Sequence, residues 1–320
     1  MKKILIISQH DDFSTDEVMN WLISLGECVI RINYNDFVNI LDFKIEQGNC
    51  FFEFSHRGEK INSDEIKSVY YRRGFLNLHD ISDFNSISKN CTLNRFILQE
   101  TKTFQEFLHL LLEQKNHIGN YKNRSMNKLQ VLLYAQKCGI NIPDTYISSQ
   151  KTALLELLKN KSLITKNIFE TAYITEEKCL YGSYTYNIDN ELIDGSEDDF
   201  LYSLFQINIK KIFEIRSFYL DGVFFTTAML TQKNTKTVTD FRHYDNDLPT
   251  RIIPFKLTQD LEEKLRKLFE KLDLNTGSID MIYSEDGKYY FLEINPVGQY
   301  GMIGEPCNYY LEKQVALKLK

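Results

Sequence analysis

The sequence lacks any pair of cysteines at C-x-x-C spacing, although it contains six cysteines in 320 residues. Without such pairs, neither a disulfide framework nor a structural zinc site is expected. The six histidines also show no spacing typical of metal ligands. Scattered free thiols suit a reducing compartment, so we expect the protein in the cytoplasm.

Long apolar runs are absent too. The N-terminal run ends at Ile7 and is followed by the polar stretch Ser8–Asp12, which is too early for a signal peptide. No apolar stretch is long enough to span a membrane, so no membrane partner is expected. The formal net charge of −6 argues against a general nucleic-acid binder. We also find no internal repeat and no low-complexity linker.

The pattern that is present predicts an α/β fold built from several lobes. Residues 3–7 form a buried strand, residues 16–25 an amphipathic helix that stops at Gly26, and residues 28–32 a second strand. This β-α-β opening predicts an N-terminal α/β domain over residues 1–118. We expect a central lobe over residues 119–200 and a C-terminal lobe over residues 201–320.

The strongest chemical signal is a pair of predicted strands near the C-terminus, joined by a Ser284–Gly287 turn. Glu293 and Asn295 alternate with apolar residues on the second strand, so both point to one face. Antiparallel pairing brings Asp280 of the first strand toward that face. Oxygen ligands of this kind suit Mg²⁺. The alternative is a solvated sheet face that binds no metal.

Together with this strand pair, several motifs in a fixed order resemble the ATP-grasp ligases. The metal-binding end looks like Asp280 with Glu293-x-Asn295-Pro296. Tyr70-Tyr-Arg-Arg-Gly74, Lys211-x-x-Glu214-x-Arg216, Asp240-Phe-Arg242 and the C-terminal stretch Gly301–Lys313 are similar to the graspetide, or microviridin-type, maturases and to their grasp-with-spasm subgroup. The resemblance implies an ATP-grasp fold with the ATP cleft between the central and C-terminal lobes. The sequence departs from many ATP-grasp enzymes at residues 167–182, which contain a single glycine instead of a glycine-rich loop.

The resemblance also implies roles for individual residues. Metal ligands would be Asp280, Glu293 and Asn295, and the catalytic cations would be Arg216 and Arg242. ATP would be contacted by Lys128, Lys166, Gln206, Asn208, Ile209 and Glu214. The substrate would be contacted by Arg72, Arg73, Lys211 and Asp240. Two structural alternatives stay open: Arg216 pairs with a structural carboxylate instead of phosphate, and Arg72 and Arg73 only cap the N-terminal lobe.

The implied activity is an ADP-forming, ATP- and Mg²⁺-dependent ligase that acts on a ribosomally made precursor peptide with leader and core segments. It would join Asp or Glu side chains to Ser or Thr hydroxyls, or to Lys amines, through an acyl phosphate. One alternative is an ATP-grasp ligase that adds an amino acid to a peptide or small carboxylate. Another is a nucleotide-binding regulator without turnover. Besides the precursor peptide, a second copy of the chain is left open as a partner, in a homodimer.

Overall fold

The computed structural model describes residues 2–78, 91–123, 125–169, 173–176, 179–182, 185–231 and 250–320. Contacts divide the chain into two compact units. The first contains residues 1–125, 274–277 and 296–320, and the second contains residues 126–273 and 278–295. The second unit therefore holds the predicted central lobe together with most of the predicted C-terminal lobe, and the predicted boundaries at residues 118 and 200 remain a prediction.

The first unit is built on a four-stranded parallel sheet with the order β2-β1-β6-β7. Five of the six residues of β1 are buried, which explains the apolar run near the N-terminus. A three-stranded antiparallel sheet, β3-β4-β5, adds to the same core through Phe52, Phe54 and Ile61. The strands are β1 (Lys3–Ser8), β2 (Cys28–Asn33), β3 (Asn39–Glu46), β4 (Asn49–His56), β5 (Glu59–Asn62), β6 (Ile66–Tyr71) and β7 (Asn116–Ile118).

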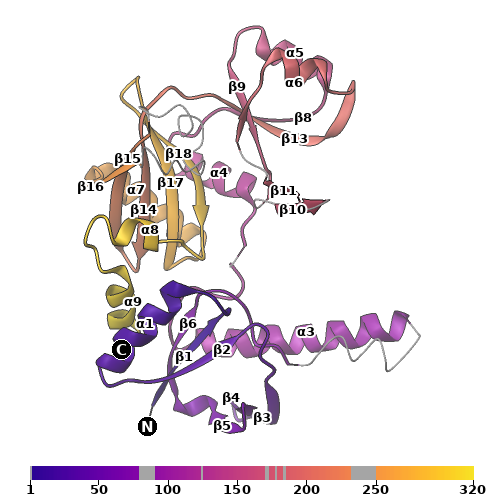
Figure 1. Ribbon diagram of the computed structural model, residues 1–320. Helices are drawn as coiled ribbons and strands as arrows, with labels where there is room; N and C mark the ends of the chain where they lie inside the picture. Colours follow the sequence, from indigo (N-terminus) through magenta and orange to yellow (C-terminus); the bar gives the residue numbers. More distant parts are fainter. Residues whose placement is uncertain are drawn as a thin grey trace. The chain divides into compact units, whose positions relative to one another are not determined.

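The helices of this unit come from both ends of the chain. Helix α9 buries Leu311, Val315, Ala316 and Leu319 on one side, and it lies beside α1 (Figure 1). Its C-terminal residues also contact the sheet, because Ser68 of β6 donates a hydrogen bond to the Leu319 carbonyl. The helical elements are α1 (Phe13–Ser24), η1 (Ser63–Glu65), α3 (Cys91–Glu113), α8 (Gly301–Gly304) and α9 (Leu311–Leu319).

The second unit has two larger sheets. One has the order β12-β9-β13-β8 and packs its core around Leu154, Leu163, Ile193 and Phe205. A separate hairpin pairs β10 with β11. The elements of this part are α4 (Lys128–Lys137), β8 (Thr145–Gln150), α5 (Lys151–Leu158), β9 (Leu163–Lys166), β10 (Tyr173–Glu176), β11 (Cys179–Gly182), β12 (Tyr186–Asn187), α6 (Asn190–Asp194) and β13 (Asp199–Ile207).

The other sheet of the second unit has five strands in the order β16-β15-β14-β17-β18. Helix α7 covers one face, where the ring of Phe269 stacks on Tyr219 of β14 with centroids 3.9 Å apart. Side chains alternate along a strand, so Glu214 and Arg216 of β14 point to the opposite face from Tyr219. The elements are β14 (Lys211–Leu220), β15 (Val223–Leu230), β16 (Arg251–Phe255), α7 (Gln259–Lys271), β17 (Thr276–Ser284) and β18 (Tyr289–Asn295).

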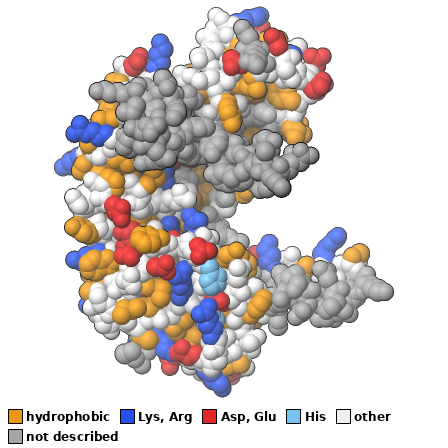
Figure 2. Space-filling model, in the orientation of Figure 1, with side chains coloured by type: hydrophobic (Ala, Val, Ile, Leu, Met, Phe, Trp, Pro, Cys, Tyr) orange, Lys and Arg blue, Asp and Glu red, His pale blue; other side chains and the backbone are white. Residues whose placement is uncertain are grey.

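On the face of the molecule shown in Figure 2, acidic and basic side chains are interspersed over the coloured part of the surface. No helix among the described residues is both long enough and apolar enough to cross a membrane.

Candidate functional site

The acidic strand pair forms as the sequence predicts. In the antiparallel ladder of β17 and β18, Asp280 lies directly opposite Glu293, and Ser278 lies opposite Asn295. Residues opposite each other in such a ladder point to the same face, with Cβ atoms about 5 Å apart. Asp280, Glu293 and Asn295 therefore share one face of the five-stranded sheet.

Arg216 reaches this face from the neighbouring strand β14. Its Nη1 donates to both carboxylate oxygens of Asp280, at 2.9 and 3.0 Å. The Arg216 side chain is only 6% exposed and that of Asp280 15% exposed. A buried guanidinium needs a partner, and here the partner is the predicted metal ligand.

Lys128 supplies a second cation from the first turn of α4. Its Nζ lies 3.0 Å from Glu293 Oε2, and both side chains are partly exposed. The start of this helix is fixed by Asn127, whose Oδ1 accepts hydrogen bonds from the backbone N–H groups of Leu129 and Gln130 at 3.0 and 3.2 Å. The N-cap thus places Lys128 at the first helical position, next to the acidic strand.

A third ion pair lies at the start of β14. Lys211 Nζ is 2.5 Å from Glu214 Oε1, and Thr231 donates to the same carboxylate oxygen at 3.3 Å. Glu214 is buried and points to the same face as Arg216, two residues along the strand. This pairing joins one residue predicted to contact ATP with one predicted to contact the substrate.

Three residues predicted to contact ATP lie at the end of β13 or directly after it. Gln206 is fully buried; its Nε2 donates to Thr145 Oγ1 at 2.8 Å, and its Oε1 has no hydrogen-bond partner among the described residues. Asn208 is exposed, and its side chain donates to Asn187 at 2.9 Å. Ile209 follows in the connection to β14, and Lys166 ends β9 opposite Leu204. These four assignments remain predictions. Arg242 and Asp240 lie outside the described residues.

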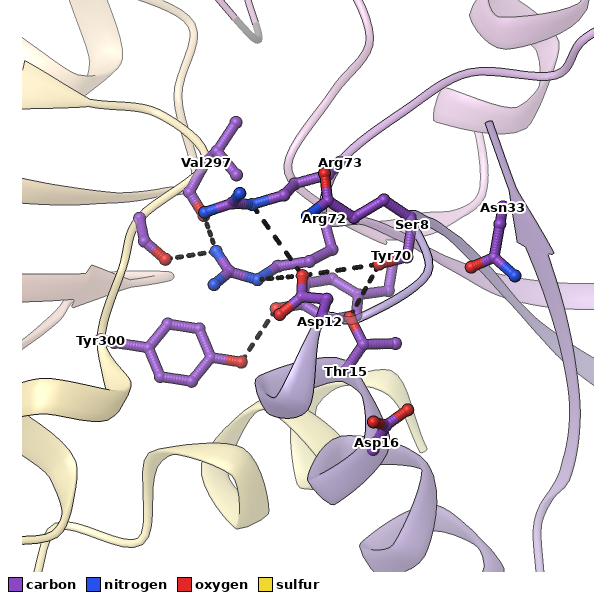
Figure 3. Close-up of polar contacts among 12 residues, drawn as sticks. Ser8, Asp12, Thr15, Asp16, Asn33, Tyr70, Arg72, Arg73, Val297 and Tyr300 are labelled. Carbon is purple, nitrogen blue, oxygen red and sulfur yellow. Dashed lines mark hydrogen bonds and ion pairs between the residues drawn. The ribbon is translucent and has the colours of Figure 1, made fainter. Parts of the chain in front are cut away.

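The arginine pair of the first unit forms a separate cluster (Figure 3). Arg72 Nε lies 3.2 Å from Asp12 Oδ2, and its Nη1 donates to the carbonyl oxygens of Val297 and Gly298. The guanidinium also lies 5.0 Å from the centre of the Tyr300 ring. Burial lowers the pKa of Arg72, but the neighbouring tyrosines and Asp12 outweigh it, so its pKa is raised above the ordinary value.

Tyr70 completes this cluster with a 3.0 Å hydrogen bond to the Tyr300 hydroxyl. Burial raises the pKa of both phenols. Neither Asp12 nor Tyr300 was among the predicted site residues. A sequence signal for Asp12 does exist, because it follows the buried strand β1 at the carboxyl edge of a parallel sheet, where ligand sites of such folds gather. Tyr300 has no comparable signal, because its partners Tyr70 and Arg72 are 230 and 228 positions away in the sequence.

The donor set on β17 and β18 fits a hard divalent cation. It provides two carboxylates and one amide oxygen on one face, and Asp280 and Glu293 are accessible enough to exchange partners. Among the described residues, no group of three or more His, Cys, Asp and Glu side chains is placed to hold a metal ion. A metal ion here would therefore need the amide oxygen of Asn295 and oxygens of a bound phosphate group, in addition to the carboxylates of Asp280 and Glu293.

Comparisons with known proteins show which fold contains these residues. A family described as the MvdD pre-ATP grasp domain matches residues 3–125, which is less than half of the chain. No curated protein matches the sequence.

Solved structures resemble the chain over nearly its whole length. A RiPP-associated ATP-grasp ligase from Chryseobacterium gregarium, in complex with ADP and a leader and core peptide, has a TM-score of 0.82 and 23% identity, covering 100% of this chain and 96% of the other. The macrocyclase MdnC from Microcystis aeruginosa, bound with precursor peptide MdnA, has a TM-score of 0.77 and 22% identity, covering 99% of each chain. The macrocyclase MdnB from the same organism has a TM-score of 0.72 and 20% identity, covering 100% of this chain and 99% of the other.

These likenesses define the class of fold. The chain has the ATP-grasp fold, and its residues 3–125 match the model of the MvdD pre-ATP grasp domain. The predicted α/β ATP-grasp fold is thus confirmed.

Proposed function

We propose that this chain is an ATP-dependent peptide macrocyclase. It would form ester or amide crosslinks between Asp or Glu side chains and Ser, Thr or Lys side chains of a ribosomally made precursor peptide. The observation that carries the proposal is the row of charged side chains on the five-stranded sheet, where Arg216, Asp280 and Glu293 come from three neighbouring strands and Lys128 meets them from α4. Ligases crystallised with ADP or with precursor peptides have similar folds.

The chemistry requires activation of a carboxylate. A carboxylate oxygen of the peptide attacks the γ-phosphorus of ATP, and the bond to the bridging oxygen breaks, which gives an acyl phosphate and ADP. A hydroxyl or amine of the peptide then attacks the acyl carbon and loses its proton, and phosphate leaves with the original carboxylate oxygen. Each ring therefore removes one water from the peptide.

The residues of the sheet face suit the phosphoryl step, which depends mainly on positioning and on neutralisation of charge. Mg²⁺ held by Asp280, Glu293 and Asn295 would neutralise phosphate oxygens. Once these carboxylates face a cation, Arg216 and Lys128 can turn their positive charge toward phosphate. Lys166, Gln206, Asn208, Ile209 and Glu214 are proposed to hold ATP, and Arg242 to assist Arg216.

Adenine binding has one supporting observation. The Oε1 of Gln206 is a buried acceptor without a hydrogen-bond partner among the described residues, which costs about 1–3 kcal/mol. The exocyclic amine of adenine is a donor that would satisfy it. Arg73, Lys211 and Asp240 are proposed to contact the peptide, and Lys211 would do so only after leaving Glu214.

The test is incubation of the protein with ATP, Mg²⁺ and the peptide encoded beside its gene, followed by mass spectrometry. Loss of one water mass per ring, together with ADP release that depends on the peptide, supports the proposal. A gain in mass instead would indicate a ligase that adds an amino acid. Binding of ATP without ADP release under any of these conditions would indicate a regulator.

A further inference from the structure

Two consecutive arginines directly follow β6, and the structure gives them different surroundings. The backbone N–H groups of Arg72 and Arg73 both donate to the Ile7 carbonyl, at 2.9 and 3.3 Å. Both residues therefore lie at the carboxyl edge of the parallel sheet, beside the end of β1. This edge is where ligands of open α/β sheets commonly bind.

Most of the Arg72 side chain is engaged, although its Nε, like that of Arg73, makes no hydrogen bond among the described residues. Its side chain is only 3% exposed, and it contacts Asp12, the carbonyls of Val297 and Gly298, and the Tyr300 ring. Figure 3 shows Asp12, Val297 and Tyr300 around its guanidinium. Arg72 thus holds the chain segment that directly follows Asn295 and Pro296, and it has little capacity left for a ligand.

Arg73 differs from Arg72 because its side chain is 32% exposed and because it shares its carboxylate partner, Asp12, with Arg72. Its Nε lies 4.0 Å from Asp12 Oδ2, the same oxygen that Arg72 Nε approaches at 3.2 Å. The Nε atom of Arg73 is buried without a hydrogen bond among the described residues. Burial lowers the pKa of Arg73, and the charge of Arg72 lowers it further. Within the described part of the chain, the two guanidiniums share Asp12 as their ion-paired carboxylate, and the charge of Glu312 also acts on Arg72.

A narrow recess opens beside Arg73. It has a cavity volume of about 20 Å³ and is lined by Arg72, Arg73, Gly74, Gly119, Asn120 and Asn123, among others. Two of its walls require glycine. A Cβ on Gly74 would lie 2.6 Å from the Ser8 carbonyl oxygen, and one on Gly119 would lie 2.6 Å from the Tyr71 carbonyl oxygen. Both glycines also have positive φ, at 111° and 68°.

The walls are held by a network of hydrogen bonds. The Gly119 N–H donates to Asn275 Oδ1 at 2.9 Å, and the Asn123 N–H donates to Asn120 Oδ1 at 2.7 Å. Behind them, His109 is fully buried between Tyr71 and Tyr121 and accepts a hydrogen bond on Nε2 from the Leu76 N–H at 3.1 Å. A narrow recess beside a guanidinium that shares its carboxylate with another suits a small planar anion better than a bulky one.

We propose that Arg73 and this recess form a carboxylate-binding site for an acidic side chain of the peptide substrate, and that Arg72 is a positioning residue for it. The assignment rests on the proposed function for the identity of the ligand. Arg72 and Arg73, which the sequence alone does not distinguish, thereby receive different roles. A fork of N–H donors fits a carboxylate through two parallel hydrogen bonds, which a lysine in the same place cannot reproduce.

The probes are two acetylated, amidated tetrapeptides, Thr-Gly-Glu-Gly and its glutamine counterpart Thr-Gly-Gln-Gly, titrated into the full chain and followed by NMR. The wild type should bind the glutamate peptide about tenfold or more tightly than the glutamine peptide, and Arg73→Gln should remove that difference. The control is Arg57→Gln, because Arg57 is also paired with a single carboxylate, Asp36, but is exposed and lies away from the recess. This variant should retain the preference for glutamate.

Arg72 is tested by stability as well as binding. Arg72→Lys should lower the thermal midpoint because it removes contacts to Val297 and Gly298, whereas Arg73→Gln should leave that midpoint close to the wild-type value. Equal binding of the two peptides by the wild type, or an unchanged preference in Arg73→Gln, would overturn the assignment. Failure of the co-encoded peptide to lose water would instead count against the macrocyclase proposal and leave the peptide preference as a separate result.

Discussion

Arg216 binds both carboxylate oxygens of Asp280 through a single nitrogen, Nη1, at 2.9 and 3.0 Å. The two residues come from neighbouring strands, 64 positions apart in the sequence. This contact joins the residue proposed to face phosphate with a residue proposed to face the metal. It also keeps each charge neutralised when no ligand is bound, which a buried ion needs.

Replacement of Arg216 by lysine tests whether the guanidinium acts on the reaction. Arg216→Lys keeps the charge next to Asp280 but removes the planar set of donors, so we expect peptide-dependent ADP release to fall about 10²- to 10³-fold. Thermal unfolding should change much less than in Arg216→Ala, which leaves Asp280 without its cation. ADP release near the wild-type rate in the lysine variant would show that Arg216 is structural.

The metal assignment predicts that Glu293→Gln and Asn295→Ala abolish turnover and leave the fold intact. Both changes remove oxygen ligands from a partly exposed strand face and create no cavity in the core. Circular dichroism and ADP release measured over a range of Mg²⁺ concentrations would check this. Asp286→Asn, in the exposed turn between β17 and β18, is the matched control and should remain active. Near-normal activity of either test variant would place the metal elsewhere.

Two helix N-caps offer a comparison of stability with function. Asn127 caps α4 next to Lys128, and Thr258 caps α7 through a 3.4 Å hydrogen bond to the Leu261 N–H. Each alanine variant should lose about 1 kcal/mol of stability. Only Asn127→Ala should also weaken ATP binding, because it loosens the turn that places Lys128. Calorimetry of both variants with ATP would show this. Equal ATP affinities would indicate that Lys128 does not contact the nucleotide.

The recess predicts a backbone requirement at Gly119. Gly119→Ala places a Cβ 2.6 Å from the Tyr71 carbonyl oxygen at a φ of 68°, so we expect a loss of roughly 1–3 kcal/mol in the free energy of unfolding. Gly58→Ala is the control, since Gly58 has a φ of 82° but nothing within 4 Å of the added atom. Urea unfolding of both variants should give a clearly smaller loss for Gly58→Ala; equal losses would mean that the close approach at Gly119 is relieved without cost.

The sequence predicted much of the fold because its apolar periods are strong. Residues 3–7 and 28–32 lie in β1 and β2 as predicted, and the helix predicted over residues 16–25 is α1, Phe13–Ser24. A short element after a long one is harder to predict. The apolar pattern of residues 92–117 predicts a single helix, but α3 ends at Glu113 and residues 116–118 form β7, whose three residues carry too little pattern to be recognised. Strand β16 was also missed, because Pro254 is unusual in a strand and is tolerated here at a sheet edge.

The candidate site was predictable only in part. The alternation of Glu293 and Asn295 fixed their common face, and the register with β17 confirms that Asp280 joins them. The ion pairs could not be predicted, because the Lys128–Glu293 contact spans 165 positions and depends on how α4 packs against β18. The different roles of Arg72 and Arg73 could not be predicted for the same reason. Val297 and Gly298, whose carbonyls bind Arg72, come from the far end of the chain.

The most direct test of carboxylate activation follows an oxygen atom. The co-encoded peptide is prepared with its acidic side chains labelled with heavy oxygen and incubated with the protein, unlabelled ATP and Mg²⁺, and the released phosphate is then analysed by mass spectrometry. The acyl-phosphate route predicts one heavy oxygen in the phosphate for each ring formed and each ADP released. Ring formation that releases only unlabelled phosphate would contradict activation of the carboxylate by this chain.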